Sequence, residues 1–137
     1  MRVVLDTNVF VSGVFFSGPP ARILEAWRDG RVVLVVSAEI LIEYRRVGQK
    51  LAEKERLLDL ELWLALLVAE AEVVRAPALS ESVCRDADDD KFIACAIAGE
   101  CKIIVSGDSL LRQVSGYRGI QVVTPRSFVD DYLAGRT

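Results

Sequence analysis

The sequence contains no histidine among its 137 residues. This absence excludes histidine general acid/base catalysis, Ser-His-Asp or Cys-His nucleophilic machinery, and His-ligated zinc or iron. Any metal chemistry must therefore use oxygen ligands, which points to magnesium, manganese or calcium.

Cysteine is scarce, and its three copies lack the paired spacing of a zinc site. Cys95 lies in an apolar helical pattern, where a free cysteine is more often a small core residue than a ligand. Long apolar runs are also missing, since none reaches the roughly 18 residues that a membrane span needs. A charge at Asp6 comes too early for the apolar core of a signal peptide. We therefore expect a cytoplasmic protein without membrane contact.

The formal net charge of −3 argues against a broad nucleic-acid-binding surface. Basic residues nevertheless gather in one segment of the chain. They form either a local patch beside an acidic pocket or an ordinary solvated helix face, and the admixture of glutamate favours the second interpretation. The basic residues of this segment are Arg45, Arg46, Lys50, Lys54 and Arg56.

Strand and helix patterns alternate along the whole chain, without a linker, an internal repeat or a low-complexity segment. Such alternation is typical of an α/β domain with a mainly parallel sheet. We therefore expect a single domain over residues 1–137, built as a three-layer α/β/α sandwich around a central, mainly parallel five-stranded sheet. The predicted strands cover residues 2–5, 32–36, 73–74, 103–105 and 120–123.

The helical pattern over residues 54–70 is apolar on more than one face. Its leucine-rich part, Leu57 to Leu67 with Trp63, either faces the core or supplies an apolar partner surface. The pattern slightly favours a core-facing helix.

Acidic residues stand where predicted strands end or helices begin. Asp6 directly follows the apolar run Val3-Val4-Leu5, Asp108 follows the strand over 103–105, and Glu43 lies in the helix after the second strand. Each one alone is explained by a helix cap or a salt bridge. Ligands of open α/β sheets bind outside the carboxyl ends of the strands, so the acidic residues together predict a cation site there.

A further acidic cluster opens the helix before the fourth strand, with four aspartates within five residues. Helix N-termini favour negative charge, but adjacent like charges repel, and a bound divalent cation would relieve that repulsion. Asn8 offers two alternatives: it caps the first helix and leaves Asp6 free, or it holds Asp6 in place. The clustered aspartates are Asp86, Asp88, Asp89 and Asp90.

These motifs resemble the PIN domain (PilT N-terminus) of the VapC-like toxin class. The resemblance runs nearly from end to end and departs at Ala87, where similar chains often carry proline. The matching segments are Val4-Leu5-Asp6-Thr7-Asn8, Ser37-x5-Glu43, residues 86–96, Ile104-Val105-Ser106-Gly107-Asp108-x-x-Leu111, and Val122-Val123-Thr124-Pro125.

The resemblance implies an endoribonuclease that depends on Mg²⁺ or Mn²⁺ and cleaves RNA phosphodiesters with a metal-activated water. It implies the toxin component of a type II toxin-antitoxin pair, with a small antitoxin protein and a homodimer as its assemblies. Two alternatives stay open: a catalytically weak PIN-fold module that binds RNA or regulates, and a nuclease acting on DNA.

The resemblance also assigns roles to residues of this sequence. The catalytic acids fall on Asp6, Glu43, Asp90 and Asp108, and the metal ligands on Asp6, Asp90 and Asp108. Candidate phosphate contacts are Lys91, Arg45 and Arg46. The supporting positions are Asn8, Ser106, Asp86, Asp88 and Asp89.

Overall fold

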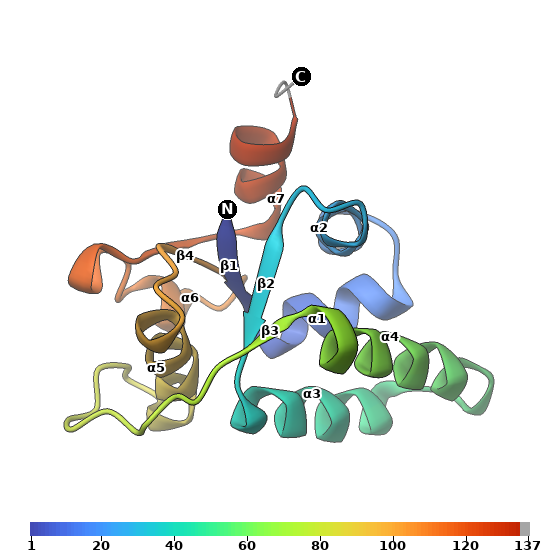
Figure 1. The fold of residues 1–137 in the computed structure, drawn as a ribbon, viewed down its shortest axis with the longest axis horizontal. Helices are drawn as coiled ribbons and strands as arrows, with labels where there is room; N and C mark the ends of the chain where they lie inside the picture. The colour runs from blue at the N-terminus through green and yellow to red at the C-terminus, as the bar shows by residue number, and fades with distance from the viewer. Residues whose placement is uncertain (135–137) are drawn as a thin grey trace.

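β1 is the central strand of a five-stranded parallel sheet in the computed structural model, which describes residues 1–134 (Figure 1). The strand order is β3-β2-β1-β4-β5. The chain adds β2 and β3 on one side of β1 and then β4 and β5 on the other, so the topological switch point of this doubly wound fold lies between β1 and β4. The strands are β1 (Arg2–Leu5), β2 (Val33–Val36), β3 (Glu72–Val73), β4 (Ile103–Val105) and β5 (Gln121–Val123).

The pairing of β1 with β4 places the next residue of each strand side by side. Leu5 pairs with Val105, and the backbone amide of Asp6 donates to the Val105 carbonyl at 2.9 Å. The buried positions of both strands are apolar and mainly β-branched, because helices cover both faces of the sheet. Asp6 and Ser106 therefore leave the buried sheet together, at the switch point.

Helices flank the sheet on two sides. In Figure 1, α1 to α4 lie on one side of the strands and α5 and α6 on the other, which confirms the expected three-layer α/β/α sandwich. α7 and the π-helical turn η4 pack against α2. The α-helices are α1 (Thr7–Phe15), α2 (Pro19–Arg28), α3 (Ala38–Leu51), α4 (Leu57–Glu70), α5 (Asp90–Ala98), α6 (Ser109–Arg112) and α7 (Pro125–Phe128), and the shorter turns are η1 (Lys54–Arg56), η2 (Ala87–Asp89), η3 (Tyr117–Gly119) and η4 (Val129–Leu133).

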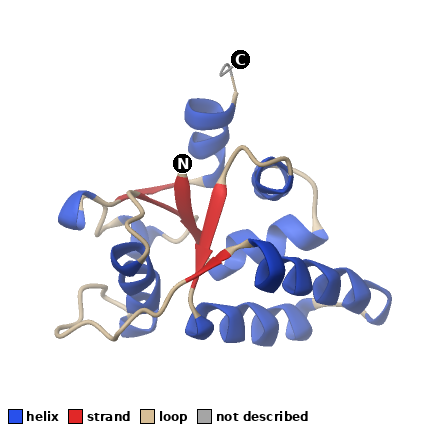
Figure 2. Ribbon diagram, viewed as in Figure 1, coloured by secondary structure: helices blue, strands red, loops and turns tan. Residues whose placement is uncertain are grey.

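The predicted strands agree with the observed ones within one residue at either end. A loop without helix or strand connects β3 to η2 and carries the chain from one edge of the sheet to α5, as the tan segment in Figure 2 shows. This loop brings the aspartates of η2 toward the switch point.

α4 shows two apolar faces. Leu60, Leu64 and Leu67 are buried, which confirms the core-facing interpretation of this helix. Leu58 and Val68 on the other face are 67% and 64% exposed. The helix therefore has one face in the core and a second, exposed apolar face that could contact a partner.

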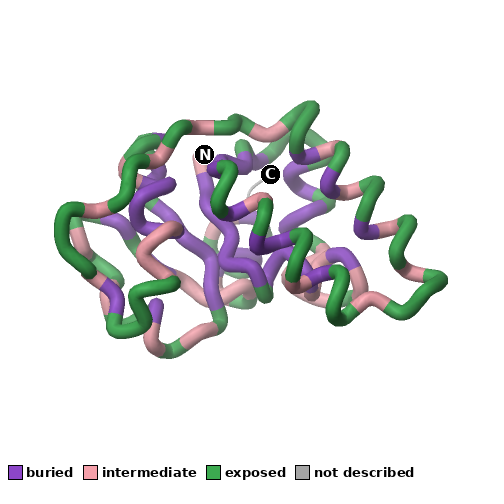
Figure 3. The backbone as a smooth tube through the Cα atoms, turned by 90° about the horizontal axis from the view of Figure 1, so that it is seen from below, coloured by how far each residue is buried: buried purple, intermediate pink, exposed green. Residues whose placement is uncertain are grey.

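Tyr44 fixes α3 against the carboxyl end of β1. Its ring stacks on Phe10 with centroids 4.4 Å apart, and its buried hydroxyl donates to the Leu5 carbonyl at 2.5 Å. Figure 3 shows the buried backbone concentrated at the centre of the molecule, with exposed backbone around it. Glu43, the neighbour of Tyr44 in α3, is thereby held near the end of the central strand.

The cysteines behave as core residues. All three are free and buried, and burial raises the pKa of the Cys95 thiol to about 12. No helix within residues 1–134 is both long and apolar enough to cross a membrane.

Candidate active site

Asp6 is a buried carboxylate with two defined hydrogen bonds. Its Oδ1 accepts from the Thr7 amide at 2.7 Å, and its Oδ2 accepts from the Ser106 hydroxyl at 2.6 Å. Burial raises its pKa, the two hydrogen bonds oppose that effect, and the nearby charges of Asp108 and Glu43 add to it. Asp6 therefore lies among other carboxylates at the switch point, as the sequence predicted.

The N-cap of α1 is Asp6 itself. The alternative in which Asn8 caps this helix and leaves Asp6 free is therefore wrong. Asn8 is exposed, and the side chain that holds Asp6 is the hydroxyl of Ser106, which comes from the far side of the switch point.

Asp108 follows β4 as the N-cap of α6. Its Oδ1 accepts from the Leu110 amide at 2.9 Å, while its own amide donates to the Ser106 hydroxyl at 3.0 Å. The single hydroxyl of Ser106 therefore bonds to both strand-end acidic residues. These bonds are compatible with the supporting role that the resemblance implies for Ser106, and that role stays a prediction.

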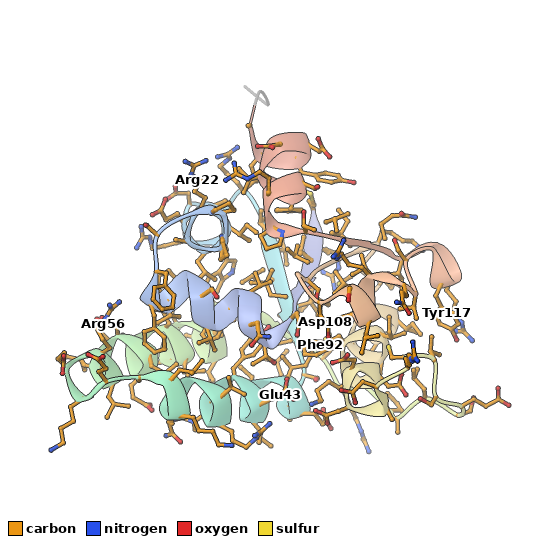
Figure 4. The ribbon with its side chains drawn as sticks, turned by 180° about the vertical axis from the view of Figure 1, so that it is seen from behind. Arg22, Glu43, Arg56, Phe92, Asp108 and Tyr117 are labelled. Carbon is orange, nitrogen blue, oxygen red and sulfur yellow. The ribbon has the colours of Figure 1, made fainter. Side chains whose placement is uncertain are left out.

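Glu43 is buried in α3 and does not stand free. It accepts hydrogen bonds from the Thr7 hydroxyl and from the Lys91 ammonium, and the Arg46 guanidinium lies 3.9 Å away. The salt bridge that could explain Glu43 on its own is therefore present in the structure. In Figure 4, Glu43, Phe92 and Asp108 lie together, whereas Arg56 and Tyr117 lie at opposite sides of the molecule.

Asp89 is the member of the aspartate cluster whose pKa is affected by the charges of both Asp6 and Asp108. Burial raises its pKa to about 7, and the charges of Asp6 and Asp108 contribute in the same direction. Its Oδ2 is buried and accepts no hydrogen bond from the part of the chain that the structure describes. A buried carboxylate oxygen without a donor is costly unless a cation or a proton satisfies it.

Asp90 has a different set of contacts. Its Oδ1 accepts from the backbone amides of Val83 at 3.1 Å and Cys84 at 2.7 Å. Burial acts to raise its pKa, but these hydrogen bonds and those of the Ser82 and Cys84 side chains lower it overall. The structure therefore favours Asp89 over Asp90 as the partner of Asp6 and Asp108, while the catalytic role predicted for Asp90 stays a prediction.

The remaining clustered aspartates lie at the surface. Asp86 caps η2 by accepting from the Asp88 amide at 3.0 Å, and Asp88 pairs with the Lys91 ammonium at 3.2 Å. Both are exposed, and their supporting roles stay predictions.

Two of the three predicted phosphate contacts lie at Glu43, and the third lies on the α4 side of α3. Lys91 and Arg46 both lie at Glu43, and hydrogen bonds to Glu43 and Asp88 raise the pKa of Lys91 although burial alone would lower it. Arg45 instead pairs with Glu61 of α4 at 2.6 Å. Arg45 thus belongs to the solvated helix face that its mixed-charge surroundings indicate.

Sequence reasoning missed the role of Thr7. Its amide binds Asp6 and its hydroxyl binds Glu43, so it joins two acidic residues that are distant in sequence. The preference for Asp89 over Asp90 had no local signal, because Asp90 precedes the buried Ile93 and Ala94 by the same spacing of three and four residues.

The arrangement fits a hydrated divalent ion better than a closed ion cage. Within residues 1–134, no three carboxylate or thiol side chains converge into a ready-made metal cluster. Mg²⁺ usually keeps several waters and binds through one or two carboxylates, which suits an open acidic site. Asp89 has the unsatisfied oxygen, and the charges of Asp6 and Asp108 act on it, so these three residues are the ones that would hold the ion.

Comparison with known families and proteins agrees with this geometry. A family profile described as "PIN domain" matches residues 2–110. An uncharacterized protein of Methanocaldococcus jannaschii, MJ1680, is 31% identical over 96% of this chain and 92% of its own length.

Solved structures share the fold at low sequence identity. VapBC2 from Rickettsia felis, bound to a DNA fragment from their promoter, aligns with a TM-score of 0.60 at 15% identity over 89% of this chain and 97% of that chain. FitAcB from Neisseria gonorrhoeae aligns with a TM-score of 0.56 at 20% identity over 90% and 98%. At such identities the likeness establishes the fold alone.

Proposed function

Because the chain belongs to the PIN-domain family, whose members are generally nucleases, we propose that it is a divalent-metal-dependent endoribonuclease. The observation that carries the proposal is the buried Asp89 oxygen without a hydrogen-bond donor in the described residues. Ser106 joins Asp6 and Asp108 at the switch point, and the charges of these two residues act on Asp89. Asp6, Asp89 and Asp108 would hold the ion, and Asp90 is retained as the alternative third ligand.

A bound Mg²⁺ or Mn²⁺ supplies an acidified water and stabilises negative charge on a phosphodiester. The protein residues prepare the site for it. Ser106 holds Asp6 in one orientation, and the cap of α6 holds Asp108. Without a cation these carboxylates repel a phosphate, so productive substrate binding requires their charge to be neutralised first.

Space for a substrate lies beside the aspartate cluster, on the side that Asp88 and Asp90 line. A cleft of about 300 Å³ lies between the start of α3, the loop after β3 and the start of α5, and Glu39, Leu79, Asp88 and Lys91 contribute to its lining. An RNA strand that enters there would pass beside Asp88 and Lys91, at the edge of the acidic site.

A nuclease assay tests the activity. Metal-stripped protein is incubated with structured and single-stranded RNA in the presence of Mg²⁺, Mn²⁺ or EDTA, and the Asp6→Asn variant is compared with Asp130→Asn, an exposed aspartate of η4. We expect RNA cleavage with either metal, no cleavage in EDTA, and loss of cleavage only in Asp6→Asn. Equal behaviour of wild type and Asp6→Asn would contradict the enzyme proposal and favour a binding or regulatory module. Cleavage of DNA but not of RNA would show that the substrate is DNA.

We further propose that the protein is the toxin of a toxin-antitoxin pair, on the support of its fold likeness to VapBC2 and FitAcB. A small antitoxin and a second copy of this chain would need apolar surface, which α3 and α4 offer. The apolar residues of α3 and α4 that are more than half exposed are Ile42, Leu51, Leu58, Leu62 and Val68.

Light scattering after size-exclusion chromatography measures whether the chain forms the proposed homodimer. A monomer mass at every protein concentration would contradict the homodimer.

The toxin assignment is tested in cells. Expression of the wild-type chain should arrest growth. We expect the neighbouring gene to encode a small protein whose co-expression restores growth. Growth arrest of equal strength by Asp6→Asn would show that toxicity does not come from the proposed chemistry.

A further inference from the structure

Glu43 differs from Asp6, Asp89 and Asp108 because its carboxylate is paired with a basic side chain. Oε2 accepts from the Thr7 hydroxyl and Oε1 from the Lys91 ammonium, and the side chain is only 11% exposed. Asp89, by contrast, has a buried oxygen without a donor in the described residues. One acidic residue is therefore satisfied by the protein, and the other is not.

Lys91 reaches Glu43 from the opposite layer of the sandwich. It belongs to α5, whereas Glu43 belongs to α3, and its ammonium also lies 3.2 Å from Asp88 of η2. Its side chain is only 19% exposed, so this ion pair is shielded from solvent on most sides. The ammonium thus bridges two carboxylates from different elements, which is the arrangement that a bound cation would otherwise supply.

The charges on either side of this bridge differ. Glu43 and Lys91 together are neutral, whereas Asp6, Asp89 and Asp108 lie in one another's field with no basic partner among residues 1–134. A single divalent ion would offset most of the charge of these three aspartates. A second divalent ion near Glu43 would have to displace the ammonium or bear its repulsion at short range.

We propose that Lys91 is a positioning residue whose ammonium acts as a built-in cation for Glu43, so that the site takes one divalent ion instead of two. This assignment rests on the proposed metal-dependent function. Glu43 then orients Thr7, and through its amide Asp6, instead of binding metal. Removal of the Lys91 charge would open Oε1 of Glu43 to a second ion, because the other basic neighbour, the exposed Arg46, lies 3.9 Å away and competes only weakly.

Titration of the full-length protein with Mn²⁺ tests the assignment, with bound ions counted by calorimetry and by electron paramagnetic resonance. We expect one ion per chain in wild type, two in Lys91→Met, and one in Lys91→Arg, which retains the charge. One ion in both wild type and Lys91→Met would overturn the role of Lys91 while leaving the proposed nuclease intact. No ion in wild type would overturn the proposed metal chemistry and this assignment with it.

A second variant serves if Lys91→Met does not fold, as judged by circular dichroism. Lys91→Gln removes the ammonium charge and retains a side-chain amide that can donate a hydrogen bond. We expect this variant to bind two Mn²⁺ ions per chain. One bound ion in a folded Lys91→Gln protein would overturn the role of Lys91.

Discussion

The hydroxyl of Ser106 donates to Oδ2 of Asp6 at 2.6 Å, across a separation of 100 residues in the sequence. The same hydroxyl accepts from the Asp108 amide at 3.0 Å. These bonds join the carboxyl ends of β1 and β4 at the switch point, and they fix the two strand-end acids relative to each other.

Ser106→Ala should weaken metal binding without unfolding the protein. Outer hydrogen-bond partners of metal ligands typically contribute about 10–100-fold in affinity or activity, and Ser106 holds Asp6 in that manner. Calorimetric Mn²⁺ titration measures the change. Ser17→Ala, at an exposed position between α1 and α2, is the control and should match wild type. Unchanged affinity in Ser106→Ala would contradict a ligand role for Asp6.

Substitution by asparagine should affect metal binding at Asp89 and protein stability at Asp90. Asp89→Asn removes a charge that faces Asp6 and Asp108, so metal binding should fall while stability is retained or increased. Asp90→Asn weakens the acceptor of the Val83 and Cys84 amides, so it should cost about 1–2 kcal/mol of unfolding free energy.

Urea denaturation and Mn²⁺ titration of both variants distinguish the two roles. If Asp90→Asn abolished binding and Asp89→Asn retained it, the third ligand would be Asp90, as the resemblance to the family first implied.

Metal affinity should increase with pH between about 6 and 8. Burial and the charges of Asp6 and Asp108 raise the pKa of Asp89 to about 7, so a proton competes with the cation below that pH. Mn²⁺ titrations at several pH values measure the slope. Asp89→Asn, which has no proton to lose, should show a flatter profile, and identical profiles for both proteins would assign the titration to another group.

The metal-free protein should lose stability over a related range. A carboxyl whose folded-state pKa is raised stabilises the fold fully below its unfolded pKa, near 3.8, and loses that contribution as pH rises through about 7. Thermal melts in EDTA from pH 5 to 8 should therefore show a larger decrease for wild type than for Asp89→Asn. A larger decrease in the variant would refute the raised pKa.

Tyr44→Phe should destabilise the protein by about 1–3 kcal/mol, because it leaves the buried Leu5 carbonyl without its donor. Urea denaturation measures the loss. Tyr117→Phe is the matched control, since its hydroxyl makes no hydrogen bond within the described residues and its position is far from the site (Figure 4). Equal effects of the two substitutions would mean that the Tyr44 hydroxyl does not anchor α3.

The sequence predicted the sheet because buried parallel strands have a strong local signal. Residues 103–105 form an uninterrupted apolar β-branched run, and Asp108 follows after a short turn. The apolar run Val3-Val4-Leu5 carries a similar signal, which placed Asp6 at the strand end. Local pattern and topology rules were sufficient for these two acids.

The contacts of Glu43 could not be predicted in the same way. They depend on how α3 and α5 approach each other across the sheet end, and no local pattern encodes that approach. Thr7 and Lys91 meet at Glu43 only in the folded chain. The choice between Asp89 and Asp90 likewise depends on the path of the loop after β3, whose amides engage Asp90.

The most direct test of the account is the rate of RNA cleavage as Mn²⁺ is added to metal-stripped protein, for wild type and Asp6→Asn in parallel. Wild type should be inactive without metal and reach a saturating rate. Asp6→Asn should remain at least about 100-fold slower at every concentration, a loss no smaller than that typical for outer partners of metal ligands. Cleavage that depends neither on added metal nor on Asp6 would contradict the proposed site.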